Sequence, residues 1–211
     1  LLKPLITNKR VLDLGCGNAG FLQLASLLAT ETYGIEPEKR ILDRYNTHEK
    51  IKISSSIYDL NTEFKSGFDL ITSFHVVEHL LDPIRTLNEL SNLLTDQGNL
   101  IIEVPNASDA LLTLYDSDAF QNFTYWSQHL FLYDSNTLKK VCEKAGLEVV
   151  SISQFQRYPL SNHLFWLAQG RPGGHQKWPF VDTEELNSAY ANTLAKAGMC
   201  DTIIAYVRRA K

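Results

Sequence analysis

The stretch VLDLGCGNAG, residues 11–20, reads as a buried strand that runs into a glycine-rich turn and then a helix. Its glycines, Gly15, Gly17 and Gly20, satisfy the G-x-G-x-x-G spacing of a nucleotide-binding loop. Glycine in such a turn lets the backbone come close to a ligand. The spacing alone does not distinguish a dinucleotide from another nucleoside cofactor, and Asp13, two residues before the first glycine, bears on that choice.

Strand and helix patterns alternate along the first half of the chain. Short apolar runs predict strands at 10–14, 32–35, 51–54, 68–74 and 99–104. Helices are predicted at 18–29, at 37–45 and from Pro83, which follows the N-cap residue Asp82. The apolar face of this last helix comprises Ile84, Leu87, Leu90 and Leu94. The alternation predicts an α/β fold, a doubly wound parallel sheet with helices on both faces, in which ligands bind beyond the carboxyl ends of the strands.

The second half of the chain is less regular. Residues 105–133 are rich in aromatic side chains, and we interpret them as an irregular or short-helix cap over the edge of the sheet. Helices are predicted at 135–145, ended by Gly146, at 160–168, and from an Asp182–Glu185 capping box to Gly198, and strands at 147–152 and 201–207. RPGGH, residues 171–175, is predicted as a turn. We therefore expect one domain over residues 1–211, with lid or insertion segments at about 105–133 and 156–181.

Composition restricts the partners and the compartment. The net charge of −4 gives no electrostatic footprint for DNA or RNA, and no apolar run approaches the roughly 20 residues that span a bilayer. The three cysteines, Cys16, Cys142 and Cys200, are widely separated and form no C-x-x-C pair. A reducing, cytoplasmic location is therefore expected. The predicted partner is a small molecule rather than a nucleic acid, and the oligomeric state stays open.

Two carboxylates indicate which cofactor the glycine loop holds. Glu36 lies about 20 residues after Gly15, at the end of the next predicted strand, where a carboxylate can accept hydrogen bonds from both ribose hydroxyls of either kind of cofactor. Asp13 is more selective, because its charge would repel a nearby diphosphate and would suit a ligand with a cationic end. S-adenosylmethionine (SAM) carries an ammonium and a sulfonium group and no phosphate. The pair therefore favours SAM over a nicotinamide or flavin dinucleotide.

At this point the chain resembles a known family, the class I SAM-dependent methyltransferases, and within it the UbiG-like subgroup. VLDLGCGNAG resembles the first motif, and GIEP at 34–37 resembles the ribose-binding acidic motif. FDLITSFHVVEHLLDPIRTLNELSNLLTDQGNLIIEVPN at 68–106 resembles the stretch from the fourth to the fifth strand, and HLFLYDSNTLKKVCEKAGLEVV at 129–150 the closing helix and strand. The resemblance implies a Rossmann-like, seven-stranded sheet whose last strand is antiparallel. The tail after 152 is similar to tails of methyltransferases among bacterial surface-polysaccharide enzymes.

The resemblance also implies a set of cofactor contacts along the strand ends. Gly15 and Gly17 let the backbone approach the methionine part of SAM, Asp13 faces its amino group, and Glu36 accepts from its ribose. The other implied contacts are Cys16 as a small loop residue, Ser56 or Asp59 for the adenine amine, Ile57 against the adenine ring, and Phe74 and His75 beside the sulfonium. Structural alternatives stay open: a buried Asp13, a Glu36 that favours the start of a helix, and a core Phe74.

Histidines are the candidate bases for methyl transfer to a hydroxyl, which usually requires removal of a proton. His129 in WSQHLFLY, before the closing helix, is the preferred base, His75 is the second choice and His163 the third. Some sugar C-methyltransferases have Glu-His-Leu-x-Tyr here with that His as base, whereas this chain has Gln128 in place of the Glu. A structural His129, bonded to the backbone of the lid, is an equally supported alternative.

The His75, Glu78 and His79 cluster raises the question of a metal site. Its spacing is i, i+3, i+4 rather than H-E-x-x-H, and the sequence offers no further ligand, so we expect no metal and a hydrogen-bonded pair that braces the loop. The function implied by the whole motif series is O- or C-methylation of a small molecule, with a sugar or nucleotide-sugar as one acceptor class. The alternative is a catalytically inactive, methyltransferase-like binding or regulatory subunit.

Overall fold

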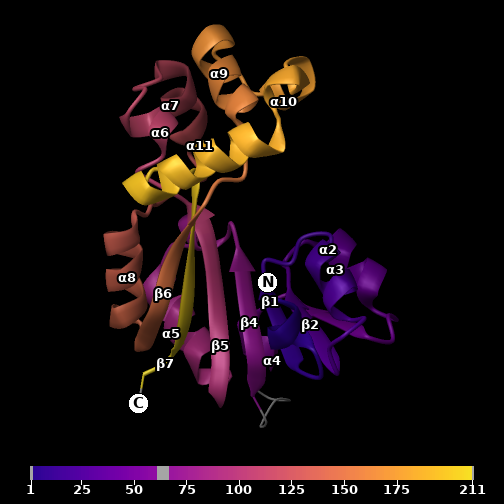
Figure 1. Ribbon diagram of the computed structural model, residues 1–211. Coiled ribbons are helices and arrows are strands. Elements are labelled where there is room, and N and C mark those ends of the chain that lie inside the picture. Colours follow the sequence, from indigo (N-terminus) through magenta and orange to yellow (C-terminus); the bar gives the residue numbers. More distant parts are fainter. Residues whose placement is uncertain (1, 61–66, 211) are drawn as a thin grey trace.

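One twisted sheet forms the centre of the protein in a computed structural model that describes residues 2–60 and 67–210 (Figure 1). Within these residues the strand order is β3-β2-β1-β4-β5-β7-β6. β7 is antiparallel to both of its neighbours, and the other pairs are parallel. The predicted sheet, with its antiparallel last strand, is confirmed. The strands are β1 (Arg10–Leu14), β2 (Glu31–Ile35), β3 (Ile51–Ser54), β4 (Phe68–Phe74), β5 (Leu94–Pro105), β6 (Leu147–Phe155) and β7 (Thr202–Arg209).

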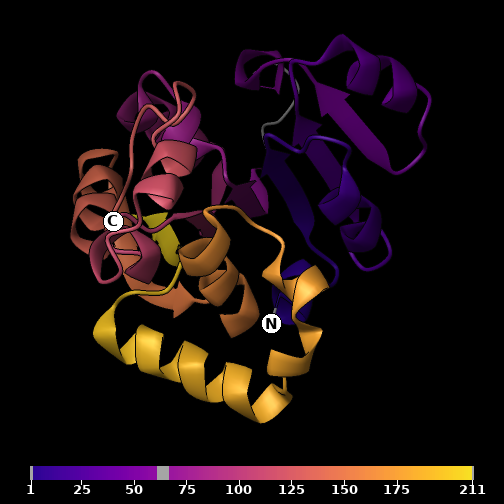
Figure 2. The ribbon, with the colours of Figure 1, turned by 90° about the horizontal axis from the view of Figure 1, so that it is seen from above.

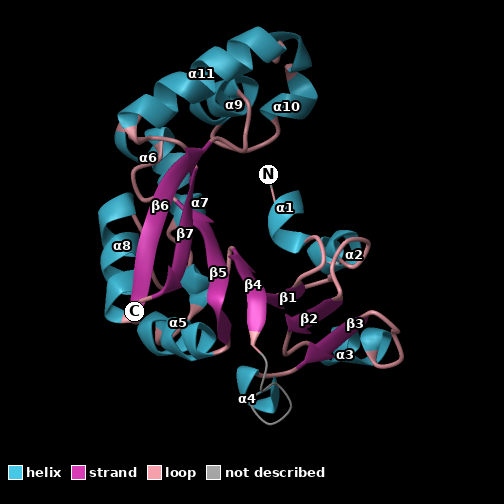
Figure 3. Cartoon of the chain, turned by 60° about the horizontal axis from the view of Figure 1, so that its bottom comes forward, coloured by secondary structure: helices cyan, strands magenta, loops and turns pink. Residues whose placement is uncertain are grey.

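Helices lie around this sheet, with α5 and α8 beside β5–β7 and with α2 and α3 beside β1–β3 (Figure 3). The α-helices are α1 (Lys3–Ile6), α2 (Gly20–Ala25), α3 (Lys39–Tyr45), α4 (Ile57–Leu60), α5 (Pro83–Asn92), α6 (Ala110–Thr113), α7 (Asp118–Thr124), α8 (Ser135–Lys144), α9 (Leu160–Gln169), α10 (Gly174–Lys177) and α11 (Glu184–Ala197). Short 3₁₀ turns are η1 (Val77–His79) and η2 (Pro179–Val181). Among the described residues, no helix is long and apolar enough to cross a membrane.

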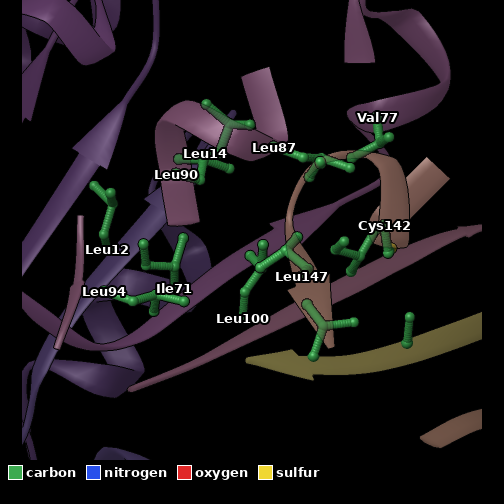
Figure 4. Packing of buried hydrophobic residues seen from close by; sticks show 14 of the residues in the cluster. Leu12, Leu14, Ile71, Val77, Leu87, Leu90, Leu94, Leu100, Cys142 and Leu147 are labelled. Carbon is green, nitrogen blue, oxygen red and sulfur yellow. The ribbon is translucent and has the colours of Figure 1, made fainter. Parts of the chain in front are cut away.

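Buried side chains alternate between the two faces of the sheet, as the period of a strand requires. Leu12 and Ile71 point into the larger cluster, which α5 and α8 cover with residues such as Leu87 and Cys142 (Figure 4). Their strand neighbours, such as Leu70, join a second cluster on the opposite face, under α1 and α2. Each fully buried Leu or Ile contributes about 1.5–3 kcal/mol. The hydrophobic core therefore fixes β1 and β4 side by side and, with them, the loops at their carboxyl ends.

Several element boundaries differ from the sequence prediction. Asp82 caps α5 as expected, since its carboxylate accepts from the amide of Arg85 at 3.0 Å. Leu94, however, is not on the apolar face of α5 but begins β5, because Phe68 pairs with Leu94 before a shift in register brings Leu70 opposite Asn99. α2 is also shorter than predicted at Gly20–Ala25, and α10 begins inside the predicted turn at Gly174.

The predicted Asp182–Glu185 capping box is wrong. Thr183 is the N-cap of α11, and its hydroxyl accepts from the amide of Leu186 at 3.2 Å. Asp182 instead accepts from the backbone amide and the hydroxyl of Ser161, at 3.2 and 2.5 Å. The side chain that resembled a local cap thus ties the start of α11 to α9. Gly198 ends α11 in the left-handed region, as predicted.

Five helices lie together above the carboxyl ends of β5 and β6 and the amino end of the antiparallel β7. They are α6, α7, α9, α10 and α11, and we call residues 110–124 and 160–197 the cap (Figure 1). α11 runs alongside α9 when the molecule is seen from above (Figure 2). Gly174 in α10 packs so closely that a Cβ there would lie 2.0 Å from the carbonyl oxygen of Ser161 in α9. Residues 106–133, for which the sequence predicted an irregular or short-helix cap, contain the short helices α6 and α7.

Asn106 ties the strand ends to the cap, and its loss is expected to destabilise the fold by about 3 kcal/mol. Its buried amide donates to the carbonyls of Gly198 and Cys200 at 3.0 and 2.8 Å, and its Oδ1 accepts from the amide of Ser108. Asn106→Ala leaves these groups without a partner. Urea denaturation measures the change, with the exposed Asn92→Ala as a control expected within about 0.5 kcal/mol of the wild type. Equal midpoints for the two variants would contradict this prediction.

Candidate active site

The glycine loop is an open turn held against the end of β2. Gly15 and Gly17 both have left-handed backbones, with φ of 70° and 50°. The amides of Gly15 and Cys16 donate to the carbonyl of Ile35, and the amide of Gly17 donates to Oε2 of Glu36 at 3.0 Å. A Cβ on Gly15 would lie 2.3 Å from Cγ2 of Val76, whereas one on Gly17 would meet nothing within 4 Å. The turn therefore packs on one side and has open space beside Gly17.

Asp13 lies beneath this loop and is buried, with 4% of its surface exposed. Its Oδ1 accepts from the hydroxyl of Thr72 in the neighbouring strand β4 at 2.7 Å. Burial raises the pKa of Asp13 to about 7, although the Thr72 hydrogen bond opposes that rise. Asp13 thus links β1 to β4, and no hydrogen bond from its carboxylate to the glycine loop occurs among the residues described.

Cys16 is also buried, and burial with nearby Asp13 and Glu36 raises the pKa of its thiol to about 12. A thiol that stays protonated is a poor nucleophile, in keeping with its predicted role as a small loop residue. Its Sγ would lie 2.5 Å from a Cβ placed on Gly34. Gly34 in β2 therefore leaves the room that the glycine loop needs.

The predicted adenine contacts lie around α4, beside the end of β3. Ile57 is buried in the large hydrophobic cluster, so its side chain serves the core. The Ser56 hydroxyl accepts from the amide of Tyr58 at 3.2 Å, and the Asp59 carboxylate accepts from the hydroxyl of Ser55 at 3.0 Å. Both polar side chains thus stabilise the turn into α4.

Phe74 and His75, at the end of β4, point to different surroundings. Phe74 packs edge-to-face on Phe21, with ring centroids 5.3 Å apart, against the second cluster, under α1 and α2. His75 has a left-handed backbone, with φ of 55°, which is uncommon for a side chain of this size. Its Nε2 lies 3.1 Å from the carboxylate of Glu103 and also contacts the guanidinium of Arg157. Burial lowers the pKa of His75, but Glu103 and the nearby Glu78 outweigh it, and the net shift is upward.

A cavity of about 350 Å³ lies between the end of the sheet and the cap. Phe120, Phe123 and Trp166 form an aromatic wall, with the Phe120 and Trp166 rings 5.1 Å apart and edge-to-face. Polar side chains also line the cavity, and they include His75, Glu78, His79, His129 and Arg157. The cavity thus combines a flat apolar surface with a group of histidines, as ligand sites commonly do.

His129 enters the cavity from the segment before α8. Its Nδ1 lies 2.8 Å from the carbonyl oxygen of Thr124. Because a carbonyl can only accept, Nδ1 carries the proton, and Nε2 is the nitrogen left with a free lone pair. His129 also packs against the rings of Trp126 and His79. Both predicted roles persist in this geometry, because the residue is bonded to the lid backbone and still has a nitrogen that can accept a proton.

The turn η1 holds this segment in place. The amides of Leu130 and Phe131 donate to the carbonyl of Glu78 at 3.0 and 3.1 Å, and Nδ1 of His79 donates to the carbonyl of Gln128 at 2.6 Å. The predicted bracing of the loop is therefore present in these backbone bonds, and His75 and Glu78 form a side-chain pair with Nδ1 3.4 Å from Oε1. Both carboxylate oxygens of Glu78 are buried, and neither has a hydrogen-bond partner among the described residues.

The structure brings to the cavity residues that sequence reasoning missed. Arg157, which follows β6, and Asp201, which precedes β7, line the cavity, whereas Glu103 near the end of β5 contacts the lining residue His75. The Asp201 carboxylate accepts from the backbone amides of residues 157 and 158. These elements are far apart in sequence. The sequence indicated only that a ligand site lies at the loops that follow the strands. His163, the third choice of base, is buried, and burial lowers its pKa to about 4. It contacts the hydroxyl of Tyr190 at 2.8 Å.

Comparison with known proteins agrees with the motif series. A family model described as a methyltransferase domain matches residues 1–152. The chain is 24% identical, over 74% of its length and 71% of the relative, to the ubiquinone biosynthesis O-methyltransferase of Coxiella burnetii. It is 28% identical, over 69% of its length and 47% of the relative, to the tRNA U34 carboxymethyltransferase of Ectopseudomonas mendocina.

Solved structures show the same fold at low sequence identity. A SAM-dependent methyltransferase from Archaeoglobus fulgidus has a TM-score of 0.63 and 22% identity, and covers 98% of this chain and 89% of its own. The plantazolicin methyltransferase BamL, solved in complex with a triazolic desmethylPZN analogue and S-adenosylhomocysteine (SAH), has a TM-score of 0.60 and 16% identity, and the match covers 100% of this chain and 80% of that one. The chain therefore belongs to the methyltransferase domain family and is a class I SAM-dependent methyltransferase.

Proposed function

We propose that this chain transfers a methyl group from SAM to a small molecule bound in the cavity beneath the cap. One observation carries the proposal: two consecutive residues, His75 and Val76, connect the cavity to the glycine loop. Val76 packs against Gly15 of the glycine loop, and His75 lines the cavity. Because β4 and β1 are paired in register, with Ser73 opposite Leu14, the loop and the cavity meet at the carboxyl edge of these strands. In this proposal the chain acts as one domain whose cap covers the acceptor.

The residues around the glycine loop fit SAM. Open space beside Gly17 admits a ligand close to the backbone, and the half-buried carboxylate of Glu36 has acceptor capacity beyond its bonds to the amides of Gly17 and Glu38. Ser56 or Asp59, near the end of β3, is the proposed acceptor for the adenine amine and would have to share its local hydrogen bond in the turn into α4. When bound, SAM supplies an activated methyl group. The protein orders the loop through the contact of Gly15 with Val76 and the bond from the Gly17 amide to Glu36, while Asp13 beneath it links β1 to β4.

His129 is the proposed general base, and His75 is the second candidate. The Thr124 carbonyl fixes the tautomer of His129 so that Nε2 can accept a proton from an acceptor in the cavity. His75 is less suited, because Glu103 and Arg157 both lie at its Nε2. The aromatic wall supports a flat ring or the apolar face of a sugar as the acceptor, with a hydroxyl directed toward His129.

Calorimetry with purified protein tests the cofactor first. One SAM and one SAH site per chain are expected, and binding of neither by folded protein would contradict the proposal. A screen of hydroxylated acceptors, sugars and nucleotide-sugars included, then follows methyl transfer by mass spectrometry. A protein that binds SAM and transfers to no acceptor class would instead support the alternative of a binding or regulatory subunit.

A further inference from the structure

A second set of functional groups converges in the cavity beside the proposed base. Glu78 and His79 of η1 and His129 each offer one ligand atom, and the three atoms lie within 4.8 Å of one another. Nε2 of His79 is 3.9 Å from Oε1 of Glu78. The sequence showed only Glu78 and His79, because His129 lies about 50 residues further along the chain. The backbone bonds of residues 128, 130 and 131 to η1 bring it alongside.

Both histidines are held as metal ligands usually are. Nδ1 of His79 donates to the Gln128 carbonyl, and Nδ1 of His129 donates to the Thr124 carbonyl. A histidine that ligates a metal commonly donates its other ring N–H to a carbonyl, which fixes the tautomer and orients the ring. Here the two backbone bonds leave the two Nε2 lone pairs free.

Glu78 supplies an independent observation. Its side chain is 1% exposed, and neither carboxylate oxygen has a hydrogen-bond partner among the described residues. Nδ1 of His75 lies 3.4 Å from its Oε1, which is an ion pair when His75 is protonated but is longer than an ordinary hydrogen bond. A buried carboxylate without hydrogen bonds is costly unless a cation compensates for the lost solvation. A divalent ion between Glu78 and the two imidazoles would compensate for it, and such an ion would face the cavity that these three residues line.

We propose that Glu78, His79 and His129 form a site for one divalent transition-metal ion. Two imidazoles and one carboxylate suit Zn²⁺, Fe²⁺ or Mn²⁺ better than Mg²⁺ or Ca²⁺, which prefer oxygen ligands throughout. Three protein ligands leave at least one coordination position open toward the cavity, as at catalytic metal sites. Metal bonds of about 2.0–2.2 Å require the three ligand atoms to draw together by small shifts of their side chains.

The metal site goes beyond the proposed function. It also gives the Nε2 lone pair of His129 a different role when the ion is bound. His129 cannot both coordinate an ion through Nε2 and accept a proton there. With the ion in place, an acceptor hydroxyl at the open position would be acidified by the metal, and His75 would be the remaining candidate base. Metal binding can be measured without SAM and without an acceptor, so the two proposals fail separately.

Cobalt(II) is the probe for the test. Protein freed of its affinity tag and treated with a chelator is titrated with Co²⁺, and binding is followed by visible absorption and by calorimetry. One Co²⁺ per chain is expected, with the absorption of a tetrahedral or five-coordinate ion, and Zn²⁺ is expected to displace it. Binding of no Co²⁺ or Zn²⁺ by folded wild-type protein would overturn the proposal.

Variants assign the ligands. Glu78→Gln, His79→Asn and His129→Asn are each expected to weaken Co²⁺ binding by more than tenfold, since even the loss of a group that only orients a ligand costs about 10–100-fold. His48→Asn is the matched control, because His48 is exposed and does not line the cavity. Circular dichroism and the urea denaturation midpoint of each variant verify that it is folded. Equal Co²⁺ affinity in all four variants would show that the ion binds elsewhere and would overturn the assignment.

Discussion

Glu36→Ala is expected to lower the affinity for SAM by about 100-fold or more. Glu36 is the carboxylate that ends β2, and its Oε2 already holds the amide of Gly17 at 3.0 Å. The substitution removes that bond from the loop and also removes the proposed acceptor for the ribose hydroxyls. Hydrogen bonds to charged groups contribute about 1.5–3 kcal/mol each, and about 2.8 kcal/mol corresponds to 100-fold in affinity. Calorimetry with SAM and SAH measures the loss directly.

Glu38→Ala is the matched control for this experiment. Glu38 is two residues away and exposed, and its carboxylate pairs with Arg40 at 2.9 Å. An exposed ion pair contributes about 0–1 kcal/mol, so the control is expected to bind SAM as the wild type does. If Glu36→Ala retained wild-type affinity while folded, the ribose role of Glu36 would be wrong, and its carboxylate would serve only to order the glycine loop.

His129→Ala is expected to reduce methyl transfer by about 10²–10⁴-fold, the usual contribution of a general base, while the affinity for SAM is unchanged. Its imidazole lies in the cavity wall with Nδ1 tied to Thr124, whereas the glycine loop lies at the ends of β1 and β2. The readout is turnover of the acceptor found in the screen, alongside calorimetry with SAM. A parallel loss of turnover and of SAM affinity would indicate that the variant is misfolded.

His48→Ala serves as the control, because this exposed histidine does not line the cavity. Full turnover in His129→Ala would transfer the role of base to His75 and favour a structural His129. The Co²⁺ titration separates the remaining roles. If wild-type protein binds no metal while His129→Ala still loses turnover, His129 acts as a base alone.

The fold was largely predictable from local patterns, and its exceptions have a common cause. Runs such as FDLITSF are buried on both faces, and the caps at Asp82 and Gly198 are local signals that the structure confirms. Leu94 was wrongly assigned to a helix, since its spacing fits one and only its pairing with Phe68 makes it a strand. Asp182 was wrongly assigned as a cap, because Ser161, a partner distant in sequence, takes its carboxylate.

In the candidate site, too, some contacts follow from neighbouring sequence and others depend on residues that are distant in sequence. Gly15, Gly17 and Glu36 fall within one strand–turn–helix–strand unit, so their proximity follows from the sequence, and the structure joins Gly17 to Glu36 by a hydrogen bond. The environment of Asp13 was less predictable. Its hydrogen-bond partner, Thr72, lies in a neighbouring strand that is distant in sequence.

The sequence by itself determined the alternation of strands and helices, the glycine turn and the family, because each depends on residues a few positions apart. Only the tertiary structure decided which side chains meet at the cavity. It brought Arg157 and Glu103 to His75 and brought His129 to Glu78 and His79, from segments with no local relation. The physical reason is that strand pairing and hydrophobic burial, rather than spacing along the chain, determine which strand ends meet.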